Sequence, residues 1–299
     1  MTEKQNGILL KSIGGFYYVE VADTVYTCKA RGVLRQQGVS PVAGDRVEIT
    51  VQEDGTGTLE TVLPRKNFLV RPPVANVDLL VTVVAVADPA PNLQVLDSLI
   101  AVAESRDIEP VLVINKTDLA AGETLEELYR KAGFTVFSVC AKMPETIEPL
   151  RAALRGKVAA FTGNSGVGKS SILNALEPSL TLETGEISKR LGRGRHTTRC
   201  ATLFRVGDGY MVDTAGFSSL NMDMVGEELT CDGLFFCFRE FERYFGKCRF
   251  ATCTHTREPG CAVRAAVEAG EIAPSRYASY EMLYEQLKGR KEWETRNGV

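Results

Sequence analysis

Residues of the types that bind phosphate stand together in the stretch GNSGVGKSS, which begins at Gly163. Gly163, Gly168, Lys169 and Ser170 fit the pattern G-x-x-x-x-G-K-[ST] without a mismatch. In this pattern the glycines let backbone N–H groups turn towards the β-phosphate, the lysine reaches the β- and γ-phosphates, and the serine hydroxyl ligates Mg²⁺. The stretch therefore predicts these nucleotide-binding residues: Gly163, Asn164, Ser165, Gly166, Val167, Gly168, Lys169, Ser170 and Ser171.

A second motif, NKTD, predicts which base is bound. A carboxylate at Asp118 can accept two hydrogen bonds from the N1–H and 2-amino groups of guanine. Adenine has neither donor and would leave a buried carboxylate unpaired, which is costly. We expect Asn115 to hold the loop and contact the base, and Lys116 to cover the face of the base. The predicted guanine site is Asn115, Lys116, Thr117 and Asp118, although NKTD alone also fits a surface turn, and a phosphate loop alone fits an ATPase or kinase.

The parts of a nucleotide switch follow the phosphate loop. DTAG, which begins at Asp213, matches D-x-x-G, so Asp213 is expected to hold Mg²⁺ through water and the Gly216 N–H to sense the γ-phosphate. The stretch SKRLGRGRHTTRC before it has the position of the first switch, whose threonine completes the Mg²⁺ shell, and both Thr197 and Thr198 fit that role. The ligands predicted for a Mg²⁺ ion bound with GTP are Ser170, Thr197, Thr198 and Asp213.

The chain lacks the glutamine that orients the attacking water in Ras-like enzymes. There a glutamine follows D-x-x-G, whereas here Phe217 follows it and cannot polarise water. The sequence therefore predicts slow intrinsic GTP hydrolysis that a partner activates. His196 in the first switch is the candidate catalytic residue, although a phosphate contact, an RNA contact or an ordinary loop residue also fits it.

Any attraction to nucleic acid must be local, because the net charge of the chain is -3. The first switch is dense in cations for an acidic protein. An RNA-phosphate contact ordered by GTP fits them, and so does a solvated loop: Lys189, Arg190, Arg193, Arg195 and Arg199.

A metal site is predicted by CRFATCTHTREPGC, which has the spacing C-x4-C-x-H-x5-C. Three thiolates and one imidazole make a closed tetrahedral shell with no open position for water, so one structural Zn²⁺ is expected. The predicted ligands are Cys248, Cys253, His255 and Cys261. A chance cluster of reduced residues is the alternative. We expect Cys231 and Cys237 to be core residues and the remaining cysteines to be unpaired: Cys28, Cys140 and Cys200.

The elements that must position these residues fall into three segments. Residues 1–72 contain short strands rich in β-branched and aromatic residues, FYYVEV, TVYTCKA, DRVEITV and GTLETVL, which predict a small β-barrel. An oligonucleotide-binding fold fits this barrel, and so does a barrel with no ligand of its own. RPPVANVD reads as a linker because of its paired prolines.

From Val77 on, buried strands alternate with helices, which indicates an α/β layer with a mostly parallel sheet. The motifs stand in the order NKTD, then VCAK, which resembles the S-A-K loop that closes over guanine, then the phosphate loop and DTAG. This is a circular permutation of the usual order, and it leads the last switch directly into the C-terminal segment. That segment reads as helical over ELTCDGLFFCFREFERYF, with two further helices broken near Pro274.

The composition excludes some other classes of protein. The chain is 44% hydrophobic and 24% charged, as in soluble globular proteins, and its apolar runs are shorter than the roughly 20 residues of a membrane-spanning helix. The N-terminus has no signal-peptide pattern and neither end has a lipidation motif, which argues against a membrane-signalling GTPase. We expect a cytoplasmic protein with reduced cysteines and, by default, a monomer.

Taken together, these residues resemble one family. The barrel, the permuted order of NKTD, GNSGVGKSS, GRHTT and DTAGF, and the trailing C-x4-C-x-H-x5-C are similar to the ribosome small-subunit-dependent GTPase A family, also written RsgA or YjeQ. That family usually reads D-T-P-G-F and often H-T-T-T, where this chain has Ala215 and Arg199. Neither change removes a predicted metal or phosphate ligand.

The resemblance implies an OB-like barrel over residues 1–72, a circularly permuted P-loop GTPase over 73–220 and an α-helical zinc-binding domain over 221–299. It also implies a GTP-hydrolysing switch in late maturation of the small ribosomal subunit. Such a switch binds ribosomal RNA and is stimulated by the subunit. The alternative is a GTP-gated RNA-binding module in which hydrolysis is incidental.

Overall fold

The structure is a computed structural model that describes residues 4–32, 34, 38–70, 73–178, 201–213 and 229–288. The chain forms two compact units. The first contains Met1–Leu79, Glu148–Thr162 and Lys169–Ser218, and the second contains Leu80–Ile147, Gly163–Gly168 and Ser219–Val299. Within the described residues, no helix is both long and apolar enough to cross a membrane. The division into domains at 72 and 220 stays a prediction.

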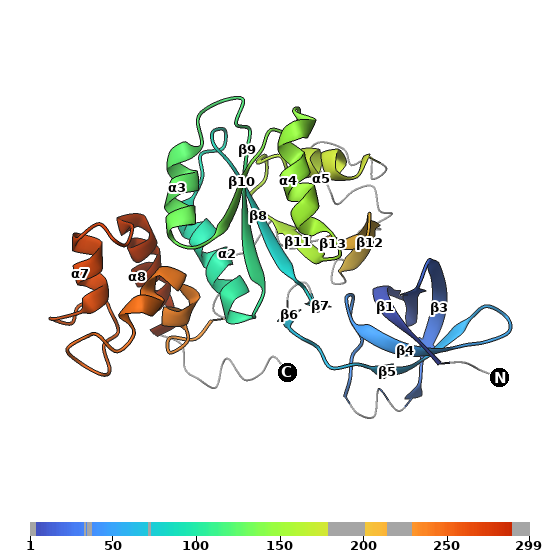
Figure 1. The fold of residues 1–299 in the computed structure, drawn as a ribbon. Coiled ribbons are helices and arrows are strands. Elements are labelled where there is room, and N and C mark those ends of the chain that lie inside the picture. Colours follow the sequence, from blue (N-terminus) through green and yellow to red (C-terminus); the bar gives the residue numbers. More distant parts are fainter. Residues whose placement is uncertain are drawn as a thin grey trace. The chain divides into compact units, whose positions relative to one another are not determined.

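The first unit begins with a closed five-stranded barrel of order β1-β2-β3-β5-β4, which confirms the predicted β-barrel (Figure 1). The strands are β1 (Lys4–Ile13), β2 (Phe16–Val21), β3 (Thr24–Ala30), β4 (Arg46–Val51) and β5 (Gly57–Val62). Neighbouring strands are antiparallel except β3 and β5. The buried residues Leu9, Val19, Cys28, Ile49 and Leu59 fill its core.

Strand β1 was not among the four strands that the sequence predicts. Its pairing with β2 shifts register between Leu9 and Lys11, so the alternation of buried and exposed residues is interrupted there. Gly7 is required by a close approach, since a Cβ at this position would lie 2.6 Å from the carbonyl oxygen of Glu20. A bulge and a strand glycine both weaken the period-two pattern on which sequence-based recognition of a strand depends.

The segment predicted to be a linker is partly a β-hairpin. Strands β6 (Phe68–Val70) and β7 (Pro73–Ala75) pair antiparallel. The buried side chain of Asn67 accepts from the Val77 N–H at 2.9 Å and donates to the Val77 carbonyl at 2.8 Å. This pairing closes the hairpin at its open end, which proline composition alone does not predict.

The rest of the first unit contains α/β elements. Strands β11 (Val158–Thr162) and β13 (Gly209–Asp213) are parallel, and β12 (Thr202–Val206) pairs antiparallel with β13 at the edge. Helix α5 (Lys169–Leu176) follows the phosphate loop. Helix α4 (Pro144–Leu154) precedes β11, and from Glu148 on it belongs to the first unit. Tyr210 donates to Glu20 at 2.5 Å, and Arg205 contacts Glu20 and Asp23, so β12 and β13 are joined to barrel strand β2.

The second unit contains β8 (Leu79–Ala85), β9 (Glu109–Asn115) and β10 (Thr135–Ser138) in the order β10-β9-β8, with α2 (Leu93–Ser105) and α3 (Glu123–Lys131). Strands β9 and β10 are parallel. Every residue of β8 is buried, as predicted for a strand covered on both faces. With parallel pairing also in the first unit, the predicted mostly parallel sheet is confirmed.

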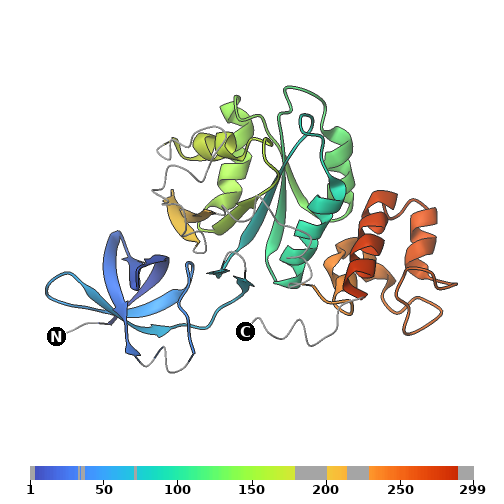
Figure 2. The same ribbon diagram turned by 180° about the vertical axis from the view of Figure 1, so that it is seen from behind.

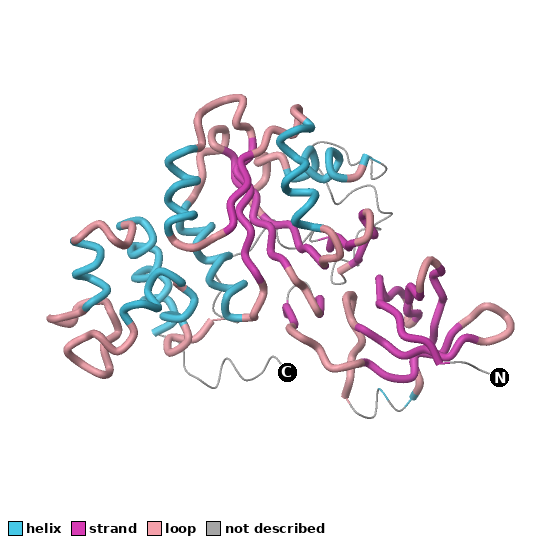
Figure 3. The backbone as a smooth tube through the Cα atoms, viewed as in Figure 1, coloured by secondary structure: helices cyan, strands magenta, loops and turns pink. Residues whose placement is uncertain are grey.

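The C-terminal part of this unit is helical but not where the sequence predicts one long helix. Residues of ELTCDGLFFCFREFERYF form turns and two short 3₁₀ segments, η3 (Leu234–Cys237) and η4 (Arg239–Tyr244) (Figure 3). The phenylalanines of this stretch are close together in the sequence and pack in several directions. A continuous amphipathic helix presents only one apolar face, so it could not bury them all. The predicted break at Pro274 is confirmed, since α7 (Ala262–Glu268) ends before it and α8 (Pro274–Lys288) begins at it.

Helix α8 lies against α2 (Figure 2). A buried charge network joins the two helices. Arg276 is 1% exposed and donates to Asp97 at 2.7 Å and to both carboxylate oxygens of Glu240. Tyr129 also donates to Asp97, at 2.7 Å. These contacts connect α2, α3, η4 and α8 into one cluster within the second unit.

Candidate nucleotide-binding site and metal cluster

The backbone conformation of the phosphate loop requires its glycines. Gly163, Gly166 and Gly168 have φ of 137°, 80° and 93°, a region that favours glycine. A Cβ on Gly163 would lie 2.1 Å from the carbonyl oxygen of Val83, and a Cβ on Gly168 would lie 2.2 Å from Asn115 Nδ2. The loop is thus a tight turn against β8 and β9 that leaves no room for side chains at its two ends.

The turn ends where α5 begins, at Lys169. Asn164, Ser165 and Gly166 are exposed, whereas Ser170 and Ser171 are half-buried in the first turn of the helix. Burial lowers the pKa of Lys169, because removal from water disfavours its charged form. An anion beside this lysine would reverse that effect, and the helix N-terminus adds amide donors, so the local chemistry fits a phosphate.

The guanine motif and the phosphate loop lie together in the second unit. Asn115 is the last residue of β9, and its Nδ2 donates to the carbonyl oxygen of Val167 at 2.8 Å. Its Oδ1 is buried and has no hydrogen-bond partner within the described residues. Thr117 Oγ1 donates to the carbonyl oxygen of Val139 at 3.1 Å. Asn115 therefore connects the two motifs through its Nδ2, and its Oδ1 is available to accept a hydrogen bond from a ligand or from water.

The carboxylate predicted to recognise guanine is held by the VCAK loop. Lys142 Nζ lies 2.8 Å from Asp118 Oδ2. The hydrogen bond from Lys142 lowers the pKa of Asp118, which favours the ionised form that can accept two guanine N–H groups. Lys116 has φ of 63° and its Nζ donates to the carbonyl oxygen of Asp88. The sequence places Lys142 in the VCAK loop but does not indicate that its side chain pairs with Asp118.

Several predicted residues lie outside the described part of the chain: Gly216, Thr197, Thr198 and the candidate catalytic residue His196. Phe217, Cys200 and the cations of the first switch also lie outside it. Asp213 is the last residue of β13, and its side chain is outside the description too. The assignments of the Mg²⁺ ligands and of the residue that activates water therefore stay predictions.

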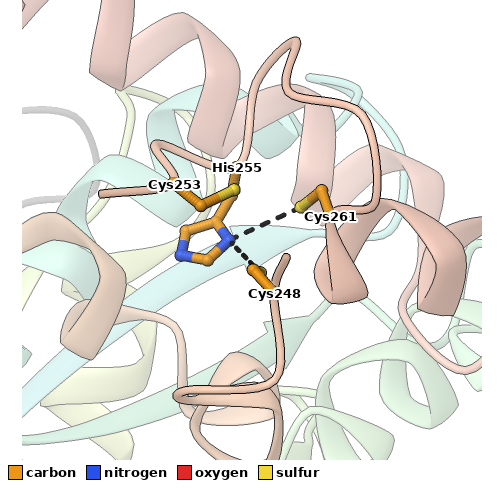
Figure 4. A group of neighbouring side chains, drawn as sticks. All are labelled: Cys248, Cys253, His255 and Cys261. Carbon is orange, nitrogen blue, oxygen red and sulfur yellow. Dashed lines mark hydrogen bonds between the residues drawn. The ribbon is translucent and has the colours of Figure 1, made fainter. Parts of the chain in front are cut away.

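The four predicted metal ligands meet in one cluster (Figure 4). Their ligand atoms all lie within 4.8 Å of one another. His255 Nδ1 is 3.4 Å from Cys248 Sγ and 3.5 Å from Cys261 Sγ. Around a tetrahedral zinc, bond lengths of about 2.3 Å to sulfur and 2.0 Å to nitrogen place a sulfur and a nitrogen about 3.5 Å apart. The donor set and its spacing fit a closed four-coordinate metal site.

Residues outside the ligand set hold this loop in place. Tyr277 and Tyr280 on α8 donate to the carbonyl oxygens of His255 and Thr254, each at 2.9 Å. Burial opposes ionisation of Glu258, but hydrogen bonds from Thr254 and neighbouring backbone N–H groups lower its pKa to about 2. These hydrogen bonds are not predictable from the spacing of the four ligands. Two features of the sequence could have suggested them: Glu258 lies between the ligands His255 and Cys261, and Tyr277 and Tyr280 are three positions apart on one helix.

Burial lowers the pKa of His255, which favours the neutral imidazole that a metal requires. The residue has φ of 61°, an uncommon conformation for a side chain of this size, and the strain is consistent with a functional constraint. Of the other cysteines, Cys28, Cys140 and Cys237 are buried, as core residues are, whereas Cys231 is only partly buried.

Two family descriptions match this chain. The family described as RsgA GTPase matches residues 62–223, and the one described as RsgA N-terminal domain matches residues 6–59.

Curated relatives cover nearly the whole chain. A protein of Moorella thermoacetica named "Small ribosomal subunit biogenesis GTPase RsgA" is 46% identical, over 95% of this chain and 98% of its own length. A protein of the same name from Alkaliphilus metalliredigens is 43% identical, over 96% and 99%.

Solved structures agree. The crystal structure of YjeQ from Thermotoga maritima has a TM-score of 0.82 and 36% identity, covering 97% of this chain and 100% of that one. The crystal structure of YloQ, described as a circularly permuted GTPase, has a TM-score of 0.81 and 32% identity, covering 97% and 96%. The permuted order of motifs that the sequence shows is therefore shared with a solved GTPase structure.

Proposed function

The chain belongs to the RsgA GTPase family and is a GTP-hydrolysing enzyme, and from this premise we propose that it acts in biogenesis of the small ribosomal subunit. In this proposal the subunit and its ribosomal RNA are the partners, and binding to them stimulates hydrolysis. The protein works in the cytoplasm as a monomer and leaves the subunit after GTP is hydrolysed.

The observation that supports the nucleotide site best is the hydrogen bond from Asn115 to Val167, since it joins the guanine motif to the phosphate loop. Asp118, ionised beside Lys142, accepts from guanine, and the stem of Lys116 covers the base. The N–H groups of residues 163–168 surround the β-phosphate, and the attraction of the phosphates for Lys169 offsets the cost of its burial.

The hydroxyl of Ser170 and the carboxylate of Asp213 are the proposed Mg²⁺ ligands, with Thr197 or Thr198 from the first switch. Mg²⁺, when bound, neutralises charge on the β- and γ-phosphates. Hydroxyl and carboxylate oxygens are hard donors that suit this ion. Gly216 is proposed to contact the γ-phosphate and His196 to orient the attacking water. Phe217 has no group that can do so, hence the dependence on a partner.

We propose Zn²⁺ as the metal of the Cys248, Cys253, His255 and Cys261 cluster. The four donors leave no position for water, so the ion is structural and its role is to fix the loop against α8. Metal analysis of the purified protein tests this, with one equivalent of zinc expected. Content far below one equivalent in freshly purified, folded protein would contradict it.

The first experiment measures GTP hydrolysis by the purified protein, alone and with small ribosomal subunits. ATP and large subunits are the controls. We expect slow hydrolysis alone and strong stimulation by small subunits only. Fast unaided hydrolysis would show that Phe217 does not limit catalysis, and absence of stimulation would remove the small subunit as partner. The Lys169→Ala variant should lose hydrolysis under both conditions.

A further inference from the structure

Three exposed phenylalanines lie in the segment that leads into and through the metal cluster. Phe236, Phe245 and Phe250 are 59%, 66% and 44% exposed. The ring centroids of Phe236 and Phe245 are 5.6 Å apart, so two of the three rings form one continuous apolar surface. Keeping such rings in water forfeits the stabilisation that their burial would give, and exposed apolar clusters mark interaction sites.

The exposed rings stand on a rigid base. The buried ring of Phe235 meets Phe236 edge-on, with centroids 5.3 Å apart at 86°, and lies 5.9 Å from the ring of Phe245. The ring centroid of Phe235 also lies 4.8 Å from that of His255, one of the predicted metal ligands. A metal that fixes His255 therefore also fixes the platform under Phe236 and Phe245. Rings that are already ordered lose little entropy when they bind a partner.

The chain segment that contains Phe245 and Phe250 is rich in cations. Between Glu242 and Glu258 the chain has four cations and no carboxylate, although the net charge of the whole chain is -3. Lys247, Arg249 and Arg257 are exposed and form no ion pair with any carboxylate among the described residues. The guanidinium of Arg249 lies 5.6 Å from the centroid of the Phe250 ring. An unpaired cation on an aromatic ring, with further unpaired cations in the same segment, suits a partner that offers both phosphates and flat π-faces.

We infer that Phe236, Phe245 and Phe250, together with Lys247 and Arg249, form a stacking surface for unpaired bases of single-stranded RNA, hereafter the aromatic patch. Every base has a face that can stack on phenylalanine, while the cations contact the phosphates on either side. A protein partner would bury the rings but would leave these cations without the regularly spaced anions that RNA supplies. The inference rests on the proposed function, which brings the chain to ribosomal RNA.

The test uses the full-length protein with its metal and fluorescein-labelled oligouridine and oligoadenosine of about twelve nucleotides, a length within the usual range of single-strand sites. A duplex RNA of the same length is the control ligand. Affinity is measured by fluorescence anisotropy at one fixed salt concentration. The aromatic variants are Phe236→Ala with Phe245→Ala, and Phe236→Leu with Phe245→Leu, which keeps an apolar side chain but removes the ring.

We expect both double variants to bind the single strands about tenfold or more weakly, because base stacking on aromatic side chains is lost. Duplex affinity should change by less than about twofold, since stacked bases cannot reach the rings. Lys247→Glu should weaken both ligands, because its contact is to phosphate. Lys288→Glu is the charge-matched control, as Lys288 is already paired with Glu285, and should have little effect.

Zinc content and GTP affinity of each variant must equal those of the unchanged protein, which shows that the fold is kept. Single-strand affinity that is unchanged in both aromatic variants overturns the inference. So does a loss of subunit-stimulated hydrolysis without a loss of oligonucleotide affinity, because the occupant is then a protein of the subunit. If the oligonucleotide result is as expected but small subunits give no stimulation, the proposed function fails and the aromatic patch stands.

Discussion

At the scale of single residues, Gly168 shows how little freedom the phosphate loop has. Gly168→Ala would place a Cβ 2.2 Å from Asn115 Nδ2, so either the loop or the guanine motif must move. We expect GTP affinity to fall by at least about a hundredfold, or about 2.8 kcal/mol, which is more than the roughly 1–2 kcal/mol that a positive φ alone costs an alanine. Fluorescence titration with a labelled GTP analogue measures this.

Gly166→Ala is the matched control for that variant. Gly166 also has positive φ, at 80°, but the nearest atom to its Cβ would be Pro89 Cδ at 3.7 Å, an ordinary contact. Equal losses in the two variants would mean that backbone strain, and not the clash with Asn115, accounts for the effect.

Lys142 is expected to extend the pH range over which guanine is bound. Its hydrogen bond lowers the pKa of Asp118, so the carboxylate stays ionised further into acid. In Lys142→Met this pKa rises towards its ordinary value, and GTP affinity should begin to fall at a higher pH as the solution is acidified. Dissociation constants measured from neutral pH down through the ordinary pKa of an aspartate carboxyl, about 3.9, test this, with Lys142→Arg as the control. Identical pH profiles for Lys142→Met and the unchanged protein would exclude this role.

Residues also show the limits of sequence reasoning. The chemical types of Asp118 and His255 and their spacings sufficed to predict a guanine site and a metal site. The Asn115 to Val167 bond links residues 52 positions apart, and the Tyr280 to Thr254 bond depends on the direction in which α8 crosses the loop. Such contacts follow from tertiary packing, which periodicity and motif spacing do not encode.

At the scale of elements, α8 and the metal loop support each other. Cys253→Ser removes one ligand, so we expect the zinc content to fall well below one equivalent and the C-terminal part to lose stability. Structural zinc contributes about 10–16 kcal/mol in isolated zinc-finger peptides, which makes the loss large. Metal analysis and thermal unfolding measure it. Cys231→Ser, outside the cluster and only partly buried, should keep both zinc and melting temperature, and loss of zinc in that variant too would contradict the ligand assignment.

The joint between α2 and α8 depends on one buried guanidinium. Arg276→Met leaves Asp97 and Glu240 buried without their cation, which typically costs about 3–5 kcal/mol. Urea unfolding of the variant measures the cost. Arg243→Met is the control, since the Arg243–Glu271 pair is exposed and such pairs contribute about 0–1 kcal/mol. If both variants lost a similar free energy of unfolding, burial of the Arg276 network would contribute little to stability.

Elements differ in how well the sequence predicts them. The near-continuous apolar run of β8 and the proline at the start of α8 are strong local patterns, and both elements form as expected. Strand β1 contains a bulge, and η3 and η4 carry phenylalanines that pack in several directions. In those segments the local pattern is set by tertiary contacts and matches no single period.

At the scale of the whole molecule, the permuted order of motifs was readable from the sequence, because each motif is recognisable on its own. The compact units were not, since the chain passes between them five times. Two of these crossings flank Gly163–Gly168, so the phosphate loop belongs to one unit while the segments before and after it belong to the other.

That interleaving restricts how the gene can be divided. No single cut in the coding sequence separates the two units, and any fragment that keeps Val158–Thr162 together with Lys169–Leu176 must also carry the loop between them. Recombination at one breakpoint therefore always leaves residues of both units on at least one side of the cut, so neither unit can be exchanged whole.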